Sequence, residues 1–323
     1  MRDSRHSRGP LMDRRQALSA SALLGMTVAA GGLGMTATTN ARAAETMDDV
    51  GVVPVPLPEP APQTEGLVDV GDGHQIWYFD TGGTGNAVIF LHAGTGSGLV
   101  WGYQQPVFAK AGYRMIGYSR RGRANSKVGD LDKPGNGSDD LLKLVDHLGL
   151  DKFHLLGTAA GGMIATDFTV SHEDRLLSLV LANTIVGITN DDYRAIYGLL
   201  WPKEFGPLPG DFKELGPSYR HLDVEGRARW NELEHKAKIA DMKSQGYANK
   251  VTWDHVEAWK VPVLVLTGDA DLYTPPSMMR LVHSRIPGAE KYLVPDSGHS
   301  AYWERPEIFN TVVLDFIGRH NGA

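Results

Sequence analysis

Cysteine is absent from this sequence of 323 residues. Its absence excludes disulfide bonds, a thiolate nucleophile and any metal site built on cysteine ligands. No segment after the first 43 residues is apolar enough to span a membrane, and no internal repeat is evident. What is present is an ordinary globular composition with 42% hydrophobic residues, enough for one large α/β domain with an insertion or for two modest domains.

Acidic residues outnumber basic ones outside the amino-terminal segment. The formal net charge of the chain is -6, and the first 43 residues hold six arginines against two aspartates, which leaves -10 on the remainder. An acidic body of this kind argues against nucleic acid as a partner and leaves small neutral or cationic molecules open. We therefore expect a small-molecule substrate, whereas the sequence says nothing of oligomeric state.

The amino-terminus has the three parts of an export signal. A basic stretch ends at Arg14-Arg15, an apolar run follows over 17–35, and Ala41-Arg42-Ala43 resembles a cleavage site. The paired arginines are similar to the twin-arginine class, so we expect a signal peptide over 1–43 and a periplasmic or secreted protein. The alternative is a membrane anchor, but the run is short and weakly hydrophobic for that, so no stable anchor is expected after cleavage.

The remainder divides into a linker and one α/β domain. Residues 44–64 are rich in proline and acidic residues and predict a flexible linker. Over 65–323, buried strands alternate with helices, which predicts a mostly parallel sheet with helices on both faces. The expected strands are 66–70, 75–80, 87–91, 114–118, 153–156, 177–182, 261–266 and 291–294, and the expected helices are 101–110, 138–148, 161–171, 276–285 and 306–319.

The interval 185–259 interrupts this alternation. It is long and irregular, and it is rich in tryptophan, tyrosine and charged residues. Because a structureless loop of this length is rare inside a compact domain, we expect a helical cap over the carboxyl edge of the sheet.

Sites in open α/β sheets lie outside the carboxyl ends of the strands, so the turns after the strands carry the chemistry. The turn over 153–162 is crowded with small residues and has Ala159 at its centre. Asp271 follows the expected strand 261–266, His299 follows the strand 291–294, and a glycine-rich turn over 91–98 follows the strand 87–91. Alone, each is a common loop feature. Together they follow the order of a catalytic triad, except that an alanine occupies the first position.

These turns resemble those of the α/β-hydrolase superfamily. Residues 157–161 are similar to its nucleophile elbow, G-x-S-x-G, with alanine in place of serine. Residues 119–126 are similar to its D-x-R-G-x-G-x-S turn, although Ser119 replaces the aspartate and Ala124 the second glycine. The resemblance extends from Gly66 to the end of the chain.

The resemblance implies a cap-bearing, esterase-like hydrolase that needs neither metal nor organic cofactor. It places Ala159 at the nucleophile position, with Asp271 as the acid and His299 as the base. It assigns the oxyanion-hole amides to Gly94 and Ala160. The superfamily also contains lyases, dehalogenases, epoxide hydrolases and cofactor-free oxygenases, so the fold does not choose the reaction.

An alanine methyl group cannot attack a carbonyl, and two explanations of Ala159 remain open. The chain is either an inactivated serine-to-alanine form of an esterase or a native enzyme in which His299 and Asp271 act as a general base. In the second case three functions remain possible. They are hydrolysis by an activated water molecule, proton abstraction as in a lyase or oxygenase, and binding without catalysis. Thr158 is adjacent, but the elbow should direct its side chain away from the site, and His92 resembles the structural histidine of the superfamily.

We expect a hydrolase that acts on a small carboxylic ester or lactone. Aromatic residues of the predicted cap are candidates for a largely apolar pocket, although such residues also form the core of a cap. The candidates are Tyr193, Tyr197, Trp201, Trp230 and Trp253.

Overall fold

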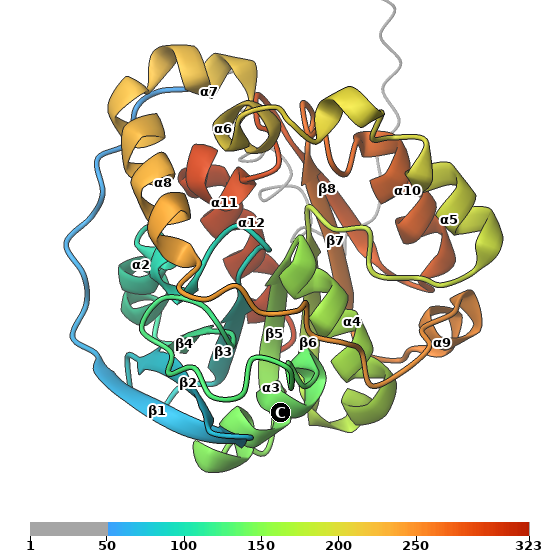
Figure 1. Cartoon of the computed structure of the whole chain (residues 1–323). Coiled ribbons are helices and arrows are strands. Elements are labelled where there is room, and N and C mark those ends of the chain that lie inside the picture. Colours follow the sequence, from blue (N-terminus) through green and yellow to red (C-terminus); the bar gives the residue numbers. More distant parts are fainter. Residues whose placement is uncertain (1–50, 323) are drawn as a thin grey trace, which may run out of the picture. The chain divides into compact units, whose positions relative to one another are not determined.

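The computed structural model describes residues 51–322. They form one 8-stranded sheet in the order β1-β2-β4-β3-β5-β6-β7-β8 (Figure 1). β1 and β2 run antiparallel to their neighbours, and β3 to β8 pair in parallel, as predicted. The strands are β1 (Thr64–Gly71), β2 (His74–Asp80), β3 (Ala87–Leu91), β4 (Arg114–Ser119), β5 (Phe153–Thr158), β6 (Leu176–Ala182), β7 (Val263–Gly268) and β8 (Glu290–Val294).

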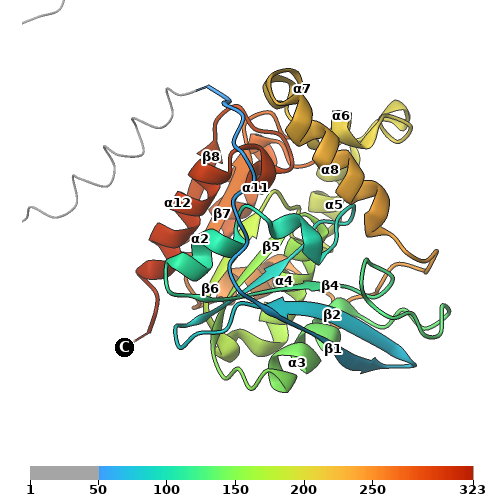
Figure 2. The same ribbon diagram turned by 90° about the vertical axis from the view of Figure 1, so that its left-hand side faces the viewer.

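Helices cover both faces of the sheet, because successive residues of the buried strands point to opposite sides. Ile89 and Leu91 belong to a core with the helices α3, α4 and α10, whereas Val88 and Phe90 belong to a core with α2 and α12. Figure 2 shows α2 and α12 together on one face. These helices are α2 (Gln105–Lys110), α3 (Gly137–His147), α4 (Ala160–His172), α10 (Pro276–Arg285) and α12 (Pro306–Gly318), with the short α11 (Ala301–Glu304) before the last.

A helical insertion lies between β6 and β7, within the predicted interval 185–259. It comprises α5 (Asp191–Gly198), α6 (Gly210–Glu214), α7 (Pro217–Leu222), α8 (Val224–Ala237) and α9 (Trp253–Ala258). Because Glu214 of α6 lines the cavity at the carboxyl edge of the sheet, this insertion is called the cap.

The segment 51–63 has no regular secondary structure, but it is attached to the domain. The Tyr103 hydroxyl donates to the carbonyl of Val55 at 2.8 Å, and Ala61 and Gln105 exchange hydrogen bonds of 2.8 and 2.7 Å. This part of the predicted linker is therefore held against α2 and is not free, which corrects the expectation of flexibility for these residues. The predicted signal peptide over 1–43 lies outside the described residues.

Within residues 51–322, none of the helices is long and apolar enough to cross a membrane.

Candidate active site

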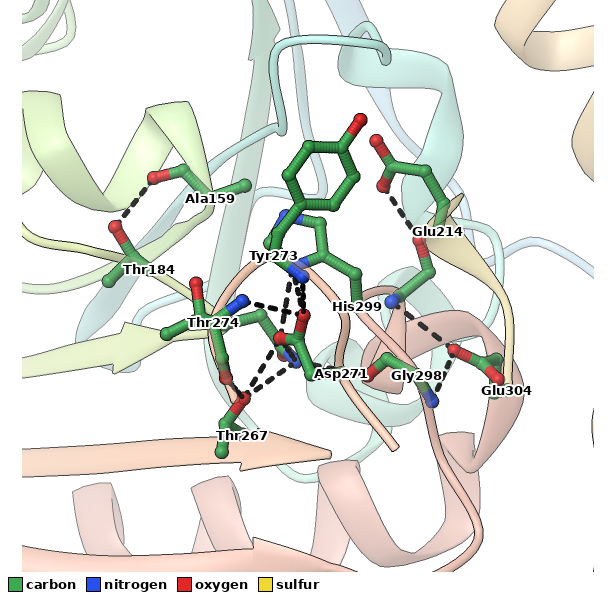
Figure 3. Close-up of polar contacts among 12 residues, drawn as sticks. Ala159, Thr184, Glu214, Thr267, Asp271, Tyr273, Thr274, Gly298, His299 and Glu304 are labelled. Atoms are coloured by element: carbon green, nitrogen blue, oxygen red, sulfur yellow. Dashed lines mark hydrogen bonds and ion pairs between the residues drawn. The ribbon is translucent and has the colours of Figure 1, made fainter. Parts of the chain in front are cut away.

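Ala159 forms the sharp turn between β5 and α4. Its φ and ψ angles are 51° and -117°, a conformation that costs a residue with a Cβ about 1–3 kcal/mol and persists only where neighbours enforce it. The amide of Ala159 donates to the carbonyl of Ala182 at 3.0 Å, and its carbonyl accepts from the Thr184 hydroxyl at 2.7 Å (Figure 3). The elbow therefore keeps its strained shape with alanine at its tip.

Glycines on both sides of Ala159 allow the strand and helix to meet. A Cβ added at Gly157 would lie 2.5 Å from the carbonyl oxygen of Gly161. A Cβ added at Gly161 would lie 2.3 Å from the carbonyl oxygen of Leu91. Such distances are far inside van der Waals contact, so both positions require glycine.

Asp271 lies in the turn after β7 and is surrounded by hydrogen-bond donors. The amides of Tyr273 and Thr274 donate to its Oδ1, both at 2.8 Å. The hydroxyl of Thr267 and the side-chain amide of Asn183 donate to its Oδ2 at 2.9 and 3.0 Å. Because each of these donors favours the charged form, they hold Asp271 as a carboxylate in a buried position.

His299 completes the pair from the turn after β8 (Figure 3). Its Nδ1 lies 2.9 Å from each carboxylate oxygen of Asp271, and Tyr273 packs on the imidazole with ring centroids 4.6 Å apart. Burial would lower the pKa of His299, but the charge and hydrogen bond of Asp271 outweigh it and raise that pKa to about 9. Burial would likewise raise the pKa of Asp271, but the charge of His299 and the surrounding donors keep it below its usual value.

Glu304 holds the backbone on both sides of His299 through hydrogen bonds. Its Oε1 accepts from the amides of Gly298 at 3.0 Å and Ser300 at 3.2 Å, and its Oε2 accepts from the amide of Gly216 in the cap at 2.6 Å. Burial raises the pKa of Glu304 to about 8, although all three hydrogen bonds act in the opposite direction. One buried carboxyl group thus ties the turn of His299 to the cap.

Gly94 and Ala160 lie next to each other, as an oxyanion hole requires. A Cβ at Gly94 would be 3.6 Å from the Cβ of Ala160, and both residues line the same cavity. Ala160 is the first residue of α4, so its N–H has no carbonyl partner within the helix, and the helix dipole there favours negative charge. The arrangement suits an oxygen that becomes negative during a reaction.

A cavity of about 230 Å³ lies at the carboxyl edge of the sheet, and several of the predicted site residues line it. Ala159, His299, Gly94 and Ala160 line it, and so does Trp201. Trp201 is the one predicted aromatic residue that lines this cavity. The remaining lining residues include Thr95, Met163, Asn183, Ile185, Glu214, Tyr273 and Thr274.

The other four predicted aromatic residues do not line this cavity, so their assignment to the pocket was wrong. Tyr193 is buried, donates from its hydroxyl to the carbonyl of Ile185 at 2.9 Å, and packs its ring against Trp253 and Tyr197. Trp230 belongs to α8 and is buried in the other core. Their rings form part of the packed hydrophobic cores, as large aromatic residues often do.

Glu214 is a site residue that sequence reasoning missed. It is only 3% exposed at the end of α6, and its Oε1 accepts from the Thr95 hydroxyl at 3.1 Å. Its carbonyl accepts from the amides of His299 and Ser300 at 2.8 and 3.0 Å. Burial raises the pKa of this carboxyl group. A single glutamate in a charged helical stretch carries no local signal, because the contact with His299 joins segments far apart in the chain.

His92 and Thr158 lie in the segments around the elbow, and both are buried as structural residues are. His92 is fully buried between the carbonyl of Ala93, 2.7 Å from its Nδ1, and the amide of Arg120, which donates to its Nε2 at 3.2 Å. Burial and the charge of Arg120 lower the pKa of His92 well below its usual value. Thr158 is fully buried and does not line the cavity.

Among residues 51–322, no three side chains of histidine, aspartate or glutamate come together in a way that could hold a metal ion.

Comparison with known protein families gives one clear match. A family model described as the alpha/beta hydrolase fold matches residues 86–306, which is more than half of the chain and contains every turn described above.

Individual relatives are more distant. The chain is 28% identical to a 2-hydroxy-6-oxononadienedioate/2-hydroxy-6-oxononatrienedioate hydrolase of Burkholderia vietnamiensis, over 78% of this chain and 94% of the relative. It superposes on a thermophilic esterase from Thermogutta terrifontis with a TM-score of 0.64 and 22% identity, covering 80% of this chain and 100% of the esterase. It also superposes on the enol-lactonase from Burkholderia xenovorans with a TM-score of 0.62 and 20% identity, covering 78% and 99%.

Proposed function

Because the chain belongs to the alpha/beta hydrolase fold family, we propose that it hydrolyses a small carboxylic ester or lactone with a water molecule in place of the missing serine hydroxyl. The observation that carries this proposal is the intact pair of His299 and Asp271 in a cavity whose elbow ends in the methyl group of Ala159. The relatives named as a hydrolase, an esterase and an enol-lactonase support the substrate class.

The first step is water attack. Nδ1 of His299 faces the carboxylate of Asp271, so the neutral imidazole carries its proton there and leaves Nε2 free to accept one. A water molecule beside Ala159 gives a proton to Nε2 while its oxygen bonds to the carbonyl carbon. The charge that develops on the carbonyl oxygen is stabilised by the amides of Gly94 and Ala160.

The second step returns the proton. The tetrahedral intermediate collapses, the bond between the carbonyl carbon and the leaving oxygen breaks, and protonated His299 gives its proton to that oxygen. The products are a carboxylic acid and an alcohol, or one hydroxy acid from a lactone. Asp271 remains a carboxylate throughout and stabilises the imidazolium that exists between the two steps.

Esters and lactones of short acyl chains provide the test of this proposal. The chain is assayed beside His299→Ala with a panel of such substrates. We expect turnover by the unaltered chain and its loss in His299→Ala, because water then has no base. Turnover that survives His299→Ala, or the absence of turnover with every ester and lactone, contradicts the proposal. In the second outcome, proton abstraction from carbon is the reaction to examine next.

We further propose that the protein acts outside the cytoplasm. The support is the order of Arg14-Arg15, the apolar run over 17–35 and Ala41-Arg42-Ala43. A chain without cysteine does not depend on disulfide formation after export.

A further inference from the structure

A second cavity, of about 310 Å³, adjoins the first and shares Gly94 and Ala160 with it. One wall is the turn after β4, over 120–123, and the other is the segment that follows α8, over 238–247. The two walls are joined by backbone hydrogen bonds: the amide of Ile239 donates to the carbonyl of Gly122 at 3.0 Å. The cavity is therefore a built feature of the domain and its cap, and Gly94 and Ala160 line both cavities.

The charged groups that line this cavity are basic. Arg121 is neutralised by Asp140, which lies 2.7 Å away in a fully buried ion pair. The exposed Lys238 and Lys243 have aspartate partners on the surface, Asp241 at 2.7 Å and Asp132 at 3.0 Å. These three cations therefore already have counter-ions.

Arg120 and Arg123 are different, because neither forms an ion pair with any residue of 51–322. Arg120 is half-buried and donates from Nη2 to the carbonyl of Ala93 at 3.0 Å and from Nε to His92 at 3.4 Å. Within residues 51–322, its Nη1 has no hydrogen-bond partner. A guanidinium has five N–H donors, so several donors of Arg120 are available to a ligand in the cavity.

The two guanidinium groups repel each other. Burial and the charge of Arg123 lower the pKa of Arg120 to about 10. Burial also lowers the pKa of Arg123, and Glu234 opposes this only in part and from beyond ion-pair distance. Both groups are charged at neutral pH, so two partly desolvated cations share one cavity without a counter-ion. An anion placed between them would remove this unfavourable energy.

The contact with Ala93 fixes where that anion would lie. Ala93 directly precedes Gly94, so the guanidinium of Arg120 is held one residue away from an oxyanion amide. A molecule that reaches from one cavity into the other would place a carbonyl at Gly94 and Ala160 and a second polar group at the arginines. The overall charge of the chain favours neutral or cationic partners, and this local pair of arginines is the exception.

We infer that Arg120 and Arg123 bind a carboxylate of the substrate while its ester or lactone carbonyl lies at Gly94 and Ala160. This inference rests on the proposed function and narrows its substrates to esters and lactones that also carry a carboxylate. Guanidinium groups bind carboxylates through paired, charge-assisted hydrogen bonds, which is why arginine suits this task.

Binding of an unreactive probe tests the inference apart from turnover. Glutarate is titrated into the full mature chain by calorimetry, with dimethyl glutarate as the uncharged counterpart. The variants are Arg120→Gln, Arg123→Gln and Arg120→Lys, and the matched control is Arg280→Gln on the exposed face of α10. We expect glutarate binding that weakens about 10- to 100-fold in each glutamine variant, is restored only in part in Arg120→Lys and is unchanged in Arg280→Gln.

The hydrolysis arm compares monoethyl glutarate with diethyl glutarate. We expect the glutamine variants to raise KM for the half-ester far more than KM for the diester, and Arg280→Gln to leave both unchanged. Arg123→Gln keeps the test valid where loss of Arg120 disturbs folding, because Arg123 donates no hydrogen bond to the oxyanion loop.

Three outcomes overturn the inference: no glutarate binding, glutarate binding that the arginine variants leave unchanged, or binding of inorganic phosphate alone with the same dependence on the arginines. Hydrolysis of the half-ester that the arginine variants leave unchanged overturns the inference but leaves the proposed function standing. Glutarate binding that depends on the arginines, without hydrolysis of any ester, supports the inference about the anion and overturns the proposed function.

Discussion

Nδ1 of His299 lies 2.9 Å from both carboxylate oxygens of Asp271, so the imidazole is held by a forked contact. Each carboxylate oxygen is also held by two donors from outside the pair. A histidine oriented in this way keeps its second nitrogen directed at the cavity, where the proposed reaction needs a base.

Asp271→Asn tests the importance of this contact. A neutral amide cannot stabilise the imidazolium formed during water attack, so we expect kcat to fall roughly 10²- to 10⁴-fold with little change in fold. Steady-state kinetics and circular dichroism measure the two effects. The control is Asp254→Asn on the exposed surface of α9, which should behave as the unaltered chain. A loss of less than about threefold would show that the acid is dispensable.

The pH dependence follows from the raised pKa of His299. Water activation needs the neutral imidazole, and the charge of Asp271 raises the pKa of His299 to about 9. The neutral fraction therefore grows as the pH rises, so kcat/KM should increase about tenfold per pH unit below the pKa and level off above pH 9. In Asp271→Asn the plateau should begin at lower pH, because the largest opposition to the effect of burial on the pKa of His299 is then lost and only the weaker effects of Glu214 and Glu304 remain. Profiles from pH 6 to 10, corrected with His299→Ala, give the answer, and a flat profile below pH 9 would exclude His299 as the base.

The close approach at the elbow predicts an effect on stability. The methyl group of Gly161→Ala would meet the carbonyl oxygen of Leu91, so the free energy of unfolding should fall by roughly 1–3 kcal/mol. Gly198→Ala is the matched control, because a Cβ there has no atom within 4 Å. Denaturant unfolding of both variants measures the difference. Equal stability of the two variants would mean that strand and helix are not packed this tightly.

Much of the fold could be predicted from the sequence, because buried parallel strands leave continuous apolar runs such as 87–91, which is β3 to the residue. The sequence predicted the ends of the helices less accurately. The helix expected over 101–110 is divided, since a short 3₁₀ turn over 98–101 comes first and α2 begins only at Gln105, beside Pro106. Proline at the start of a helix favours a new beginning there.

The site was predictable where it depends on turns after strands, and not where it depends on the cap. Asp271 and His299 follow strands and could be placed by that rule. Glu214, by contrast, contacts His299 across 85 positions of sequence and belongs to no periodic pattern. The prediction for the aromatic residues of the cap failed because their irregular spacing does not tell which rings face a cavity and which pack together.

The amino-terminal sequence makes a prediction about processing. We expect the mature protein to begin at Ala44, because a signal peptide should be cleaved after Ala41-Arg42-Ala43. Replacement of Arg14-Arg15 by two lysines should leave the uncut chain inside the cell. Mass spectrometry of the protein from its host, with and without this replacement, measures both expectations. An intact amino-terminus on a cytoplasmic protein would contradict the proposed export.

The central claim is that this site hydrolyses its substrate without a serine nucleophile, and Ala159→Ser tests it most directly. The unaltered chain and Ala159→Ser are compared on the substrate that the panel identifies, with His299→Ala as the baseline. The account predicts that the unaltered chain is already active and that the serine changes kcat/KM by less than about tenfold, because the cavity is shaped for water at this position. If the unaltered chain is no more active than His299→Ala and the serine raises activity by several orders of magnitude, the site is that of a serine enzyme and the account is wrong.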